Sequence, residues 1–168
     1  MSLIFDTHAH YDDEAFDADR ETLLASMPEH GVGLILDPGC DLGSSRRAVE
    51  LARTYPHVYA AVGWHPENCA PYTEDSLDAL RAWAREPKVV AIGEIGLDYY
   101  WEQNPPRELQ QRVLRDQLTL AQELDLPVIV HDRKAHADSL AIVQEFPAVR
   151  GVFHCFSCLL YTSPSPRD

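Results

Sequence analysis

The sequence predicts an α/β fold built on a parallel sheet. Six short, nearly continuous apolar runs alternate with segments of helical hydrophobic period, and this alternation is typical of parallel β/α units. Neither a G-x-G-x-x-G nor a G-x-x-x-x-G-K-[ST] loop occurs, so nothing favours a nucleotide-binding sheet. The alternation leaves two architectures open, a doubly wound sheet and a (β/α)8 barrel, and the polar residues at the strand ends favour the barrel.

The expected elements follow one another in order. The predicted strands are Leu3–Phe5, Val32–Gly39, Val58–Pro66, Lys88–Gly96, Pro127–His131 and Gly151–His154. The predicted helices are Asp19–Met27, Leu42–Tyr55, Asp75–Arg85, a long helix up to about Leu124, and Ala135–Glu145. Pro56 ends the second helix, and the pair Pro105-Pro106 opens the longest one.

Composition narrows the class of protein. The chain has 168 residues, 45% of them hydrophobic, which suits one globular domain with a core. No apolar run is long enough to span a membrane, and we expect no secretory signal. The four cysteines are irregularly spaced and do not indicate a disulfide framework, so we expect a cytoplasmic protein.

The formal net charge of −13 argues against a basic surface that clamps nucleic acid. It does not exclude a metal-dependent enzyme that acts on phosphates, because bound cations can reverse the local charge.

Candidate metal ligands stand at the ends of four predicted strands: His8, His10, Glu94, His131 and His154. Residues alternate between the faces of a strand, so His8 and His10 point the same way. In a barrel the carboxyl ends of the strands surround one mouth, where the active site lies. Imidazoles and a carboxylate suit two divalent ions, such as zinc or manganese, that share a hydroxide. Taken singly, each residue is also compatible with a structural role.

Five stretches resemble the TatD-like metal-dependent hydrolases, a deoxyribonuclease-associated branch of the amidohydrolase superfamily. They are "DTHAHYDD", "VYAAVGWHPE", "VVAIGEIGLDYYW", "LPVIVHDRKA" and "GVFHCFS", which together span residues 3–157. The resemblance implies a TIM-type (β/α)8 barrel, here incomplete with about six β/α units, that hydrolyses phosphodiester bonds in DNA with two divalent metal ions (Zn, Mg or Mn).

The resemblance also implies roles for individual residues. His8 and His10 would hold the first metal, Glu94 would bridge both metals, and His131 and His154 would hold the second. His65 and Arg133 would lie near the substrate, although a salt bridge is an equal alternative for Arg133. Asp98 would orient its neighbours or cap a loop, and the aromatic residues that follow it, Tyr99, Tyr100 and Trp101, would pack on the barrel rim or stack on a base.

The resemblance stops after Ser157. Residues 158–168, "CLLYTSPSPRD", show no strand or helix period, so we expect a partial hydrolase domain over 1–157 and a non-native, disordered tail. The family's last metal ligand, an eighth-strand aspartate in a "TD-x-P" motif, has no counterpart here. We therefore expect a C-terminally truncated barrel that is poorly soluble or inactive by itself as a monomer.

Two further functions stay open on the sequence. One is an amidohydrolase that acts on a cyclic amide or lactone, although Glu94 stands where many of those enzymes have a modified lysine. The other is a non-catalytic fragment that binds metal or a partner protein. The metal used, the exonuclease or endonuclease mode and the oligomeric state are left open.

Overall fold

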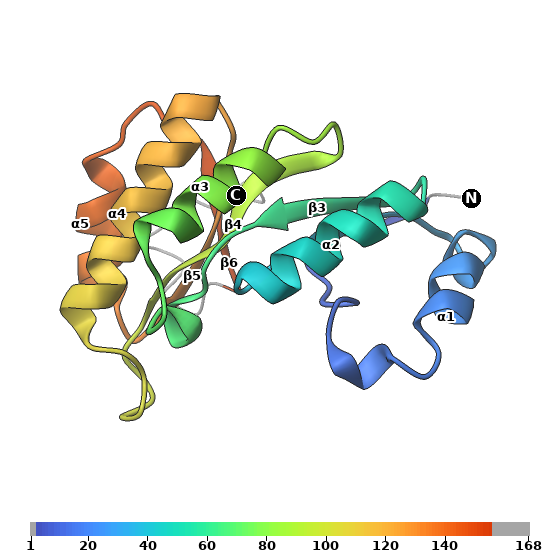
Figure 1. Cartoon of the computed structure of the whole chain (residues 1–168), viewed down its shortest axis with the longest axis horizontal. Helices are drawn as coiled ribbons and strands as arrows, with labels where there is room; N and C mark the ends of the chain where they lie inside the picture. Colours follow the sequence, from blue (N-terminus) through green and yellow to red (C-terminus); the bar gives the residue numbers. More distant parts are fainter. Residues whose placement is uncertain (1–2, 156–168) are drawn as a thin grey trace, which may run out of the picture.

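Six parallel strands form one curved sheet in the computed structural model, which describes residues 3–155 (Figure 1). Their order in space is their order in the chain, β1-β2-β3-β4-β5-β6. They are β1 (Ile4–Asp6), β2 (Val32–Pro38), β3 (Val58–Val62), β4 (Val89–Asp98), β5 (Val128–Arg133) and β6 (Gly151–His154). This arrangement confirms the predicted incomplete TIM-type barrel, because neighbouring strands are always consecutive and parallel.

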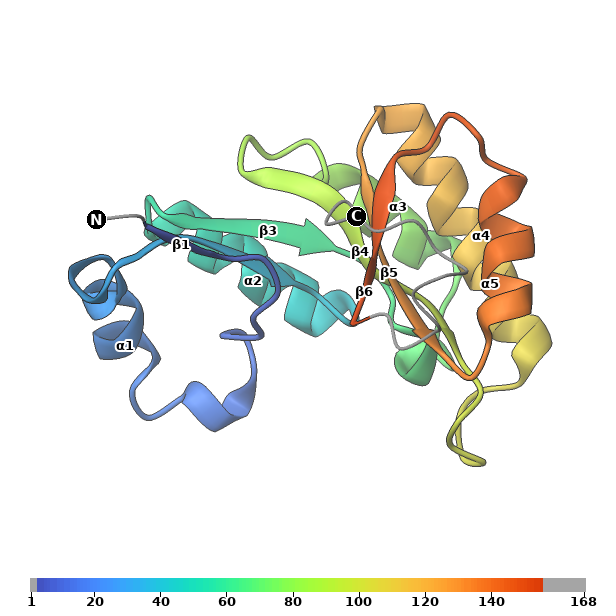
Figure 2. The same cartoon turned by 180° about the vertical axis from the view of Figure 1, so that it is seen from behind.

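Helices connect the strands, and all but the first of them cover the sheet from one side (Figure 1). They are α1 (Arg20–Ser26), α2 (Leu42–Thr54), α3 (Glu74–Trp83), α4 (Arg107–Leu124) and α5 (His136–Gln144). In Figure 1 α2 lies in front of β3, and in Figure 2 it lies behind it. The core fills the space between the two layers, where side chains such as Ile92, Leu114 and Leu118 are fully buried.

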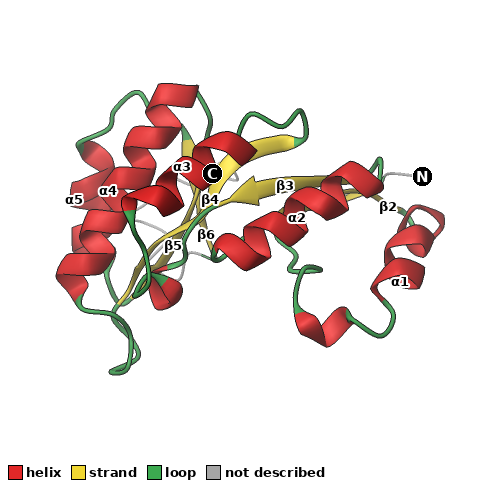
Figure 3. Ribbon diagram, in the orientation of Figure 1, coloured by secondary structure: helices red, strands yellow, loops and turns green. Residues whose placement is uncertain are grey.

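Local sequence signals explain where the helices begin and end. Asp41 begins α2 with a capping box, in which its carboxylate accepts from the Ser44 N–H at 2.8 Å. Pro106 precedes α4, and Asp125 ends it in the left-handed conformation at φ 51°. Three short 3-10 helices, Glu14–Phe16, Met27–His30 and Pro66–Asn68, join the longer elements (Figure 3).

Strand β4 runs to Asp98, two residues beyond the predicted end at Gly96. Gly96 has φ +144°, and a Cβ placed on it would lie 1.9 Å from the carbonyl oxygen of His131 on β5. Only glycine permits this approach, and it lets the pairing of β4 with β5 continue to the partners Asp98 and Arg133. The extension brings the end of β4 level with the end of β5.

The two outer strands of the described sheet, β1 and β6, are largely open to solvent. Ile4 and Phe5 on β1 and Val152 on β6 are each more than half exposed. β1 and β6 are therefore the open edges of the described sheet. Ser157 and the predicted tail, 158–168, lie outside the described residues. Within residues 3–155, no helix is both long and apolar enough to cross a membrane.

Candidate metal centre

The predicted ligands gather at the carboxyl ends of the strands. His8 and His10 follow β1, His131 lies near the end of β5, and His154 is the last residue of β6. Glu94 lies inside β4 rather than at its end, which corrects the expectation that it closes the run. Between Ile92 and Ile95, β4 contains one residue more than the facing segment of β5, so Glu94 belongs to a β-bulge. Bulges of this kind redirect a side chain, and this one contains the carboxylate of the centre.

Glu94 is the middle of the cluster and is almost fully buried. Its Oε2 lies 3.2 Å from His8 Nε2 and 3.7 Å from His10 Nε2. Its Oε1 lies 3.2 Å from His131 Nδ1 and 4.0 Å from His65 Nε2. Burial alone would raise the pKa of Glu94, but hydrogen bonds from His131 and His8 outweigh it and hold the pKa well below its usual range.

Each oxygen of Glu94 thus faces a different pair of imidazoles. The ligand atoms of His8, His10 and Glu94 lie within 4.8 Å of one another, and so do those of His65, Glu94 and His131. These are separations that two N/O-ligated divalent cations can bridge. The donor set therefore fits divalent-metal binding.

His65, which was expected near the substrate, lies beside a predicted metal ligand. Its ring centroid is 4.3 Å from that of His131, in an edge-to-face contact. Burial lowers the pKa of His65 to about 4, so the ring is neutral at neutral pH and has a lone pair to offer. A neutral ring can donate to a phosphate or ligate a metal, but it does not attract a phosphate as a cation.

His154 packs flat against His8, with ring centroids 3.5 Å apart and planes inclined by 13°. It is also the strand partner of His131. Burial, followed by the neighbouring His8, lowers the pKa of His154. Within residues 3–155, the sets of three mutually close ligand atoms include His65 rather than His154.

Asp98 connects the centre to the loop beyond β4. It is fully buried, its Oδ2 lies 3.0 Å from His131 Nε2, and its Oδ1 accepts from the Tyr100 N–H at 2.9 Å. Burial opposes the charged form of His131, but hydrogen bonds to Glu94 and Asp98 raise its pKa overall. Both expected uses of Asp98, orienting a neighbour and capping a loop, are therefore present in one carboxylate.

A second pair of buried carboxylates, Asp12 and Asp37, lies behind His10. Asp12 Oδ1 is 3.7 Å from His10 Nδ1, on the side of the ring away from Glu94. Burial, then the charge of Asp12, raises the pKa of Asp37 strongly, so Asp37 is the member that keeps a proton. This pair was not among the predicted site residues, although the aspartate inside the apolar run "LILDPG" was a signal for it.

Arg133 is exposed, with its guanidinium 4.0 Å above the ring of Tyr100 and 5.3 Å from that of Trp101. Both aromatic residues are exposed as well. Tyr99, by contrast, is half-buried and donates its hydroxyl to Asp138 at 2.9 Å. Of the three aromatic residues after Asp98, Tyr100 and Trp101 are therefore the two that present their rings to solvent.

Comparison with known proteins agrees with this geometry. The family model described as TatD related DNase matches residues 5–160. The metal-dependent hydrolase YabD of Bacillus subtilis, whose function is uncharacterized, is 40% identical over 157 residues, which cover 92% of this chain and 61% of YabD. The 3'-5' ssDNA/RNA exonuclease TatD of Salmonella typhimurium is 35% identical over 156 residues, 92% of this chain and 60% of that protein.

The crystal structure of the TatD homologue YjjV from Escherichia coli superposes with a TM-score of 0.85 at 38% identity. The match covers 94% of this chain and 62% of YjjV. The chain thus spans about three fifths of the length of the relatives it matches.

Proposed function

Since the chain belongs to the TatD related DNase family, we propose that its protein is a metal-dependent hydrolase that cleaves phosphodiester bonds in nucleic acid. Relatives named as metal-dependent hydrolases and as a 3'-5' ssDNA/RNA exonuclease support the reaction class. The observation on which the proposal depends most is Glu94, whose two oxygens face two different histidine pairs. One carboxylate placed in this way is what a binuclear centre needs.

The proposed ligands form two sets. His8, His10 and Glu94 would hold one divalent ion, and Glu94 and His131 would hold the other, together with His65 or His154. When bound, such ions supply a hydroxide at neutral pH and stabilise the charge that develops on the phosphoryl oxygens.

The residues of the chain set the orientation of these ligands. When His131 donates its Nε2–H to Asp98, its Nδ1 presents a lone pair on the side of Glu94. Asp12 lies on the corresponding side of His10, with its Oδ1 3.7 Å from the His10 Nδ1. A cavity of about 600 Å³ opens beside His10 and Asp12, and its lining includes the acidic residues Asp13, Glu14 and Asp41 together with Arg47.

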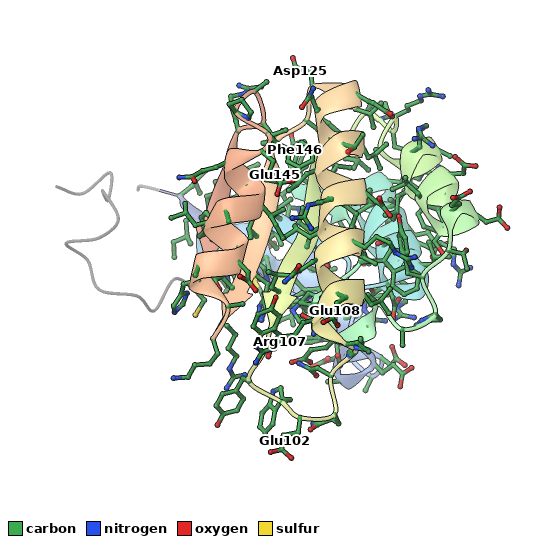
Figure 4. All side chains as sticks on the ribbon, turned by 90° about the vertical axis from the view of Figure 1, so that its left-hand side faces the viewer. Glu102, Arg107, Glu108, Asp125, Glu145 and Phe146 are labelled. Carbon is green, nitrogen blue, oxygen red and sulfur yellow. The ribbon has the colours of Figure 1, made fainter. Side chains whose placement is uncertain are left out.

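The test compares Glu94→Gln with Glu108→Gln in protein that contains the whole chain. Both changes remove one negative charge and keep the shape of the side chain, but Glu108 lies on the exposed first turn of α4 (Figure 4) and is not one of the candidate ligands. We expect Glu94→Gln to lower the bound divalent metal from two ions per chain to one or none and to abolish cleavage of a labelled oligonucleotide. Glu108→Gln should keep both properties. Unchanged metal content and cleavage in Glu94→Gln would refute the proposal, and so would turnover of a lactam in place of the oligonucleotide.

A further inference from the structure

We propose that Tyr100, Trp101 and Arg133 form a stacking platform for one base of a single-stranded nucleic acid, at the rim of the metal centre. This inference rests on the proposed function, because it names the form of nucleic acid that the same site accepts. The three residues are called the platform below.

The platform is placed directly beyond the metal centre. Arg133 is the last residue of β5, two positions after His131, and its strand partner is Asp98, the last residue of β4. Tyr100 and Trp101 follow Asp98 in the loop that leads to α4. The Asp98 carboxylate holds the Tyr100 N–H with one oxygen and lies within hydrogen-bond distance of His131 with the other. One buried side chain therefore fixes the platform relative to a candidate ligand.

The two aromatic rings of the platform are open to solvent, unlike aromatic rings that pack in a protein core. Tyr100 is 46% exposed and Trp101 is 43% exposed, and their ring centroids lie 4.6 Å apart with planes at 86°. The other large apolar side chains that are exposed in the described residues are all aliphatic, except for Phe5 on the edge strand β1. Exposed Tyr and Trp beside Arg are the residue types that stack on bases and pair with phosphates.

Arg133 gives the platform a positive charge. Within residues 3–155, its guanidinium lies over two rings rather than in an ion pair with a carboxylate, so its N–H groups stay available at the rim. In a chain of net charge −13, a polyanion can approach only where cations are concentrated locally.

Two more cations stand next to the platform. Arg107 and Lys134 line a cavity of about 510 Å³ between the β4–α4 and β5–α5 connections. Arg107 lies 4.3 Å over the ring of Tyr99, at the start of α4, while Glu102 stands farther out at the tip of the loop (Figure 4). Asp138 also lines this cavity, but it accepts the Tyr99 hydroxyl. Backbone phosphates on either side of a stacked base could follow this line of cations.

Stacking on these rings selects for unpaired bases. In a duplex the faces of the bases are covered by their neighbours, whereas a single strand or a frayed end can present one face. Every base has such a face, so the platform should favour single strands without a preference for sequence.

The test measures binding of a labelled oligonucleotide to protein that contains the whole chain, by fluorescence anisotropy. EDTA is present, so no strand is cleaved. The ligands are a mixed-sequence single strand, an abasic strand of the same length, and a blunt duplex. The variants are Trp101→Ala and Trp101→Phe, with Leu140→Ala on α5 as the control for an exposed apolar side chain. Arg133→Ala is compared with Arg150→Ala, an exposed arginine that precedes β6 at the opposite ends of the strands.

We expect Trp101→Ala to weaken binding of the single strand about tenfold, which is the usual effect of losing one base–aromatic stack. The same change should alter binding of the abasic strand by less than twofold, and Trp101→Phe should restore most of the affinity. Arg133→Ala should weaken both strands, whereas Leu140→Ala and Arg150→Ala should leave both almost unchanged.

Equal loss of affinity for the base-containing and abasic strands in Trp101→Ala would overturn the inference, and so would tighter binding of the duplex than of the single strand. Neither metal nor turnover enters the measurement. A protein that stacks bases but does not cleave would refute the proposed function alone, and a protein that cleaves without this stacking would refute the platform alone.

Discussion

His65 should make the metal-free protein less stable as the pH falls below neutrality, and His65→Asn should remove this loss. The ring is buried and its pKa is lowered to about 4, against an ordinary value of 6.5. Below pH 6.5 the unfolded chain therefore takes up a proton that the folded protein refuses. The stability that the neutral ring contributes is fully present above the pKa of His65 in the unfolded chain. It is lost as the pH falls through the pKa of His65 in the folded protein.

The size of the effect follows from the two pKa values. A difference of about 2.5 units corresponds to roughly 3 kcal/mol in free energy of unfolding once both states are protonated. By the same relation, about 2 kcal/mol of this is already lost at pH 5. Asparagine is the matched replacement, because its amide oxygen can accept the Glu67 N–H that the His65 Nδ1 now accepts at 3.3 Å.

The assay is urea denaturation in EDTA at pH 8 and at pH 5, for both proteins. The pKa values of His10 and His131 are raised, so these two residues stabilise the fold on the acid side in both proteins. Because the His131 ring contacts that of His65, the difference between the two proteins measures the titration of His65 together with its coupling to His131. The wild type should lose about 2 kcal/mol more than the variant between the two pH values. Equal losses of stability in the two proteins would show that burial does not hold the His65 ring neutral. The proposal that His65 is a metal ligand would then lose its basis.

Three more predictions concern the surroundings of the centre. Asp98→Asn should lower the metal affinity about 10- to 100-fold, measured by competition with a chelator, because His131 loses the carboxylate that orients it; unchanged affinity would contradict that role. Gly96→Ala should cause severe loss of thermal stability, since the new Cβ would meet the β5 backbone at His131; a melting temperature equal to the wild type would argue against the close approach. As the pH rises from 5 to 8.5, the Asp37→Asn protein should become more stable relative to the wild type. The raised pKa of Asp37 makes the wild-type protein lose free energy of unfolding over this range, and asparagine does not titrate. An equal dependence of the unfolding free energy on pH in the two proteins, measured by urea denaturation, would contradict the buried pair with Asp12.

The strands could be predicted from the sequence because their apolar runs are short, continuous and separated by helical periods. The errors lie where tertiary contacts override the local pattern. The end of β4 was missed because glycine at position 96 resembles a loop signal, whereas its pairing with β5 requires it. The first helix was predicted as Asp19–Met27, but α1 ends at Ser26 and a 3-10 turn that contains Pro28 follows.

The position of the site could also be predicted, since the ends of parallel strands meet at one edge. The partners within the site could not. That His65, and not His154, joins His131 and Glu94 in a set of mutually close ligand atoms depends on the curl of the sheet and on the bulge that turns Glu94 inward, and neither is encoded in sequence spacing. The contact of Asp12 with Asp37 likewise joins the first loop to β2 across space. The ligand roles of the individual histidines stay predictions.

The stack of His8 on His154 joins the two outer strands of the described sheet at the candidate metal centre. His8 follows β1 in the chain, and His154 is the last residue of β6. The two open edges of the described sheet are therefore in contact through these rings, at the end of the sheet where the ligands gather. A cation held between His8 and Glu94 would connect β1 to β4 across two intervening strands. Metal binding would then make the curved sheet more rigid.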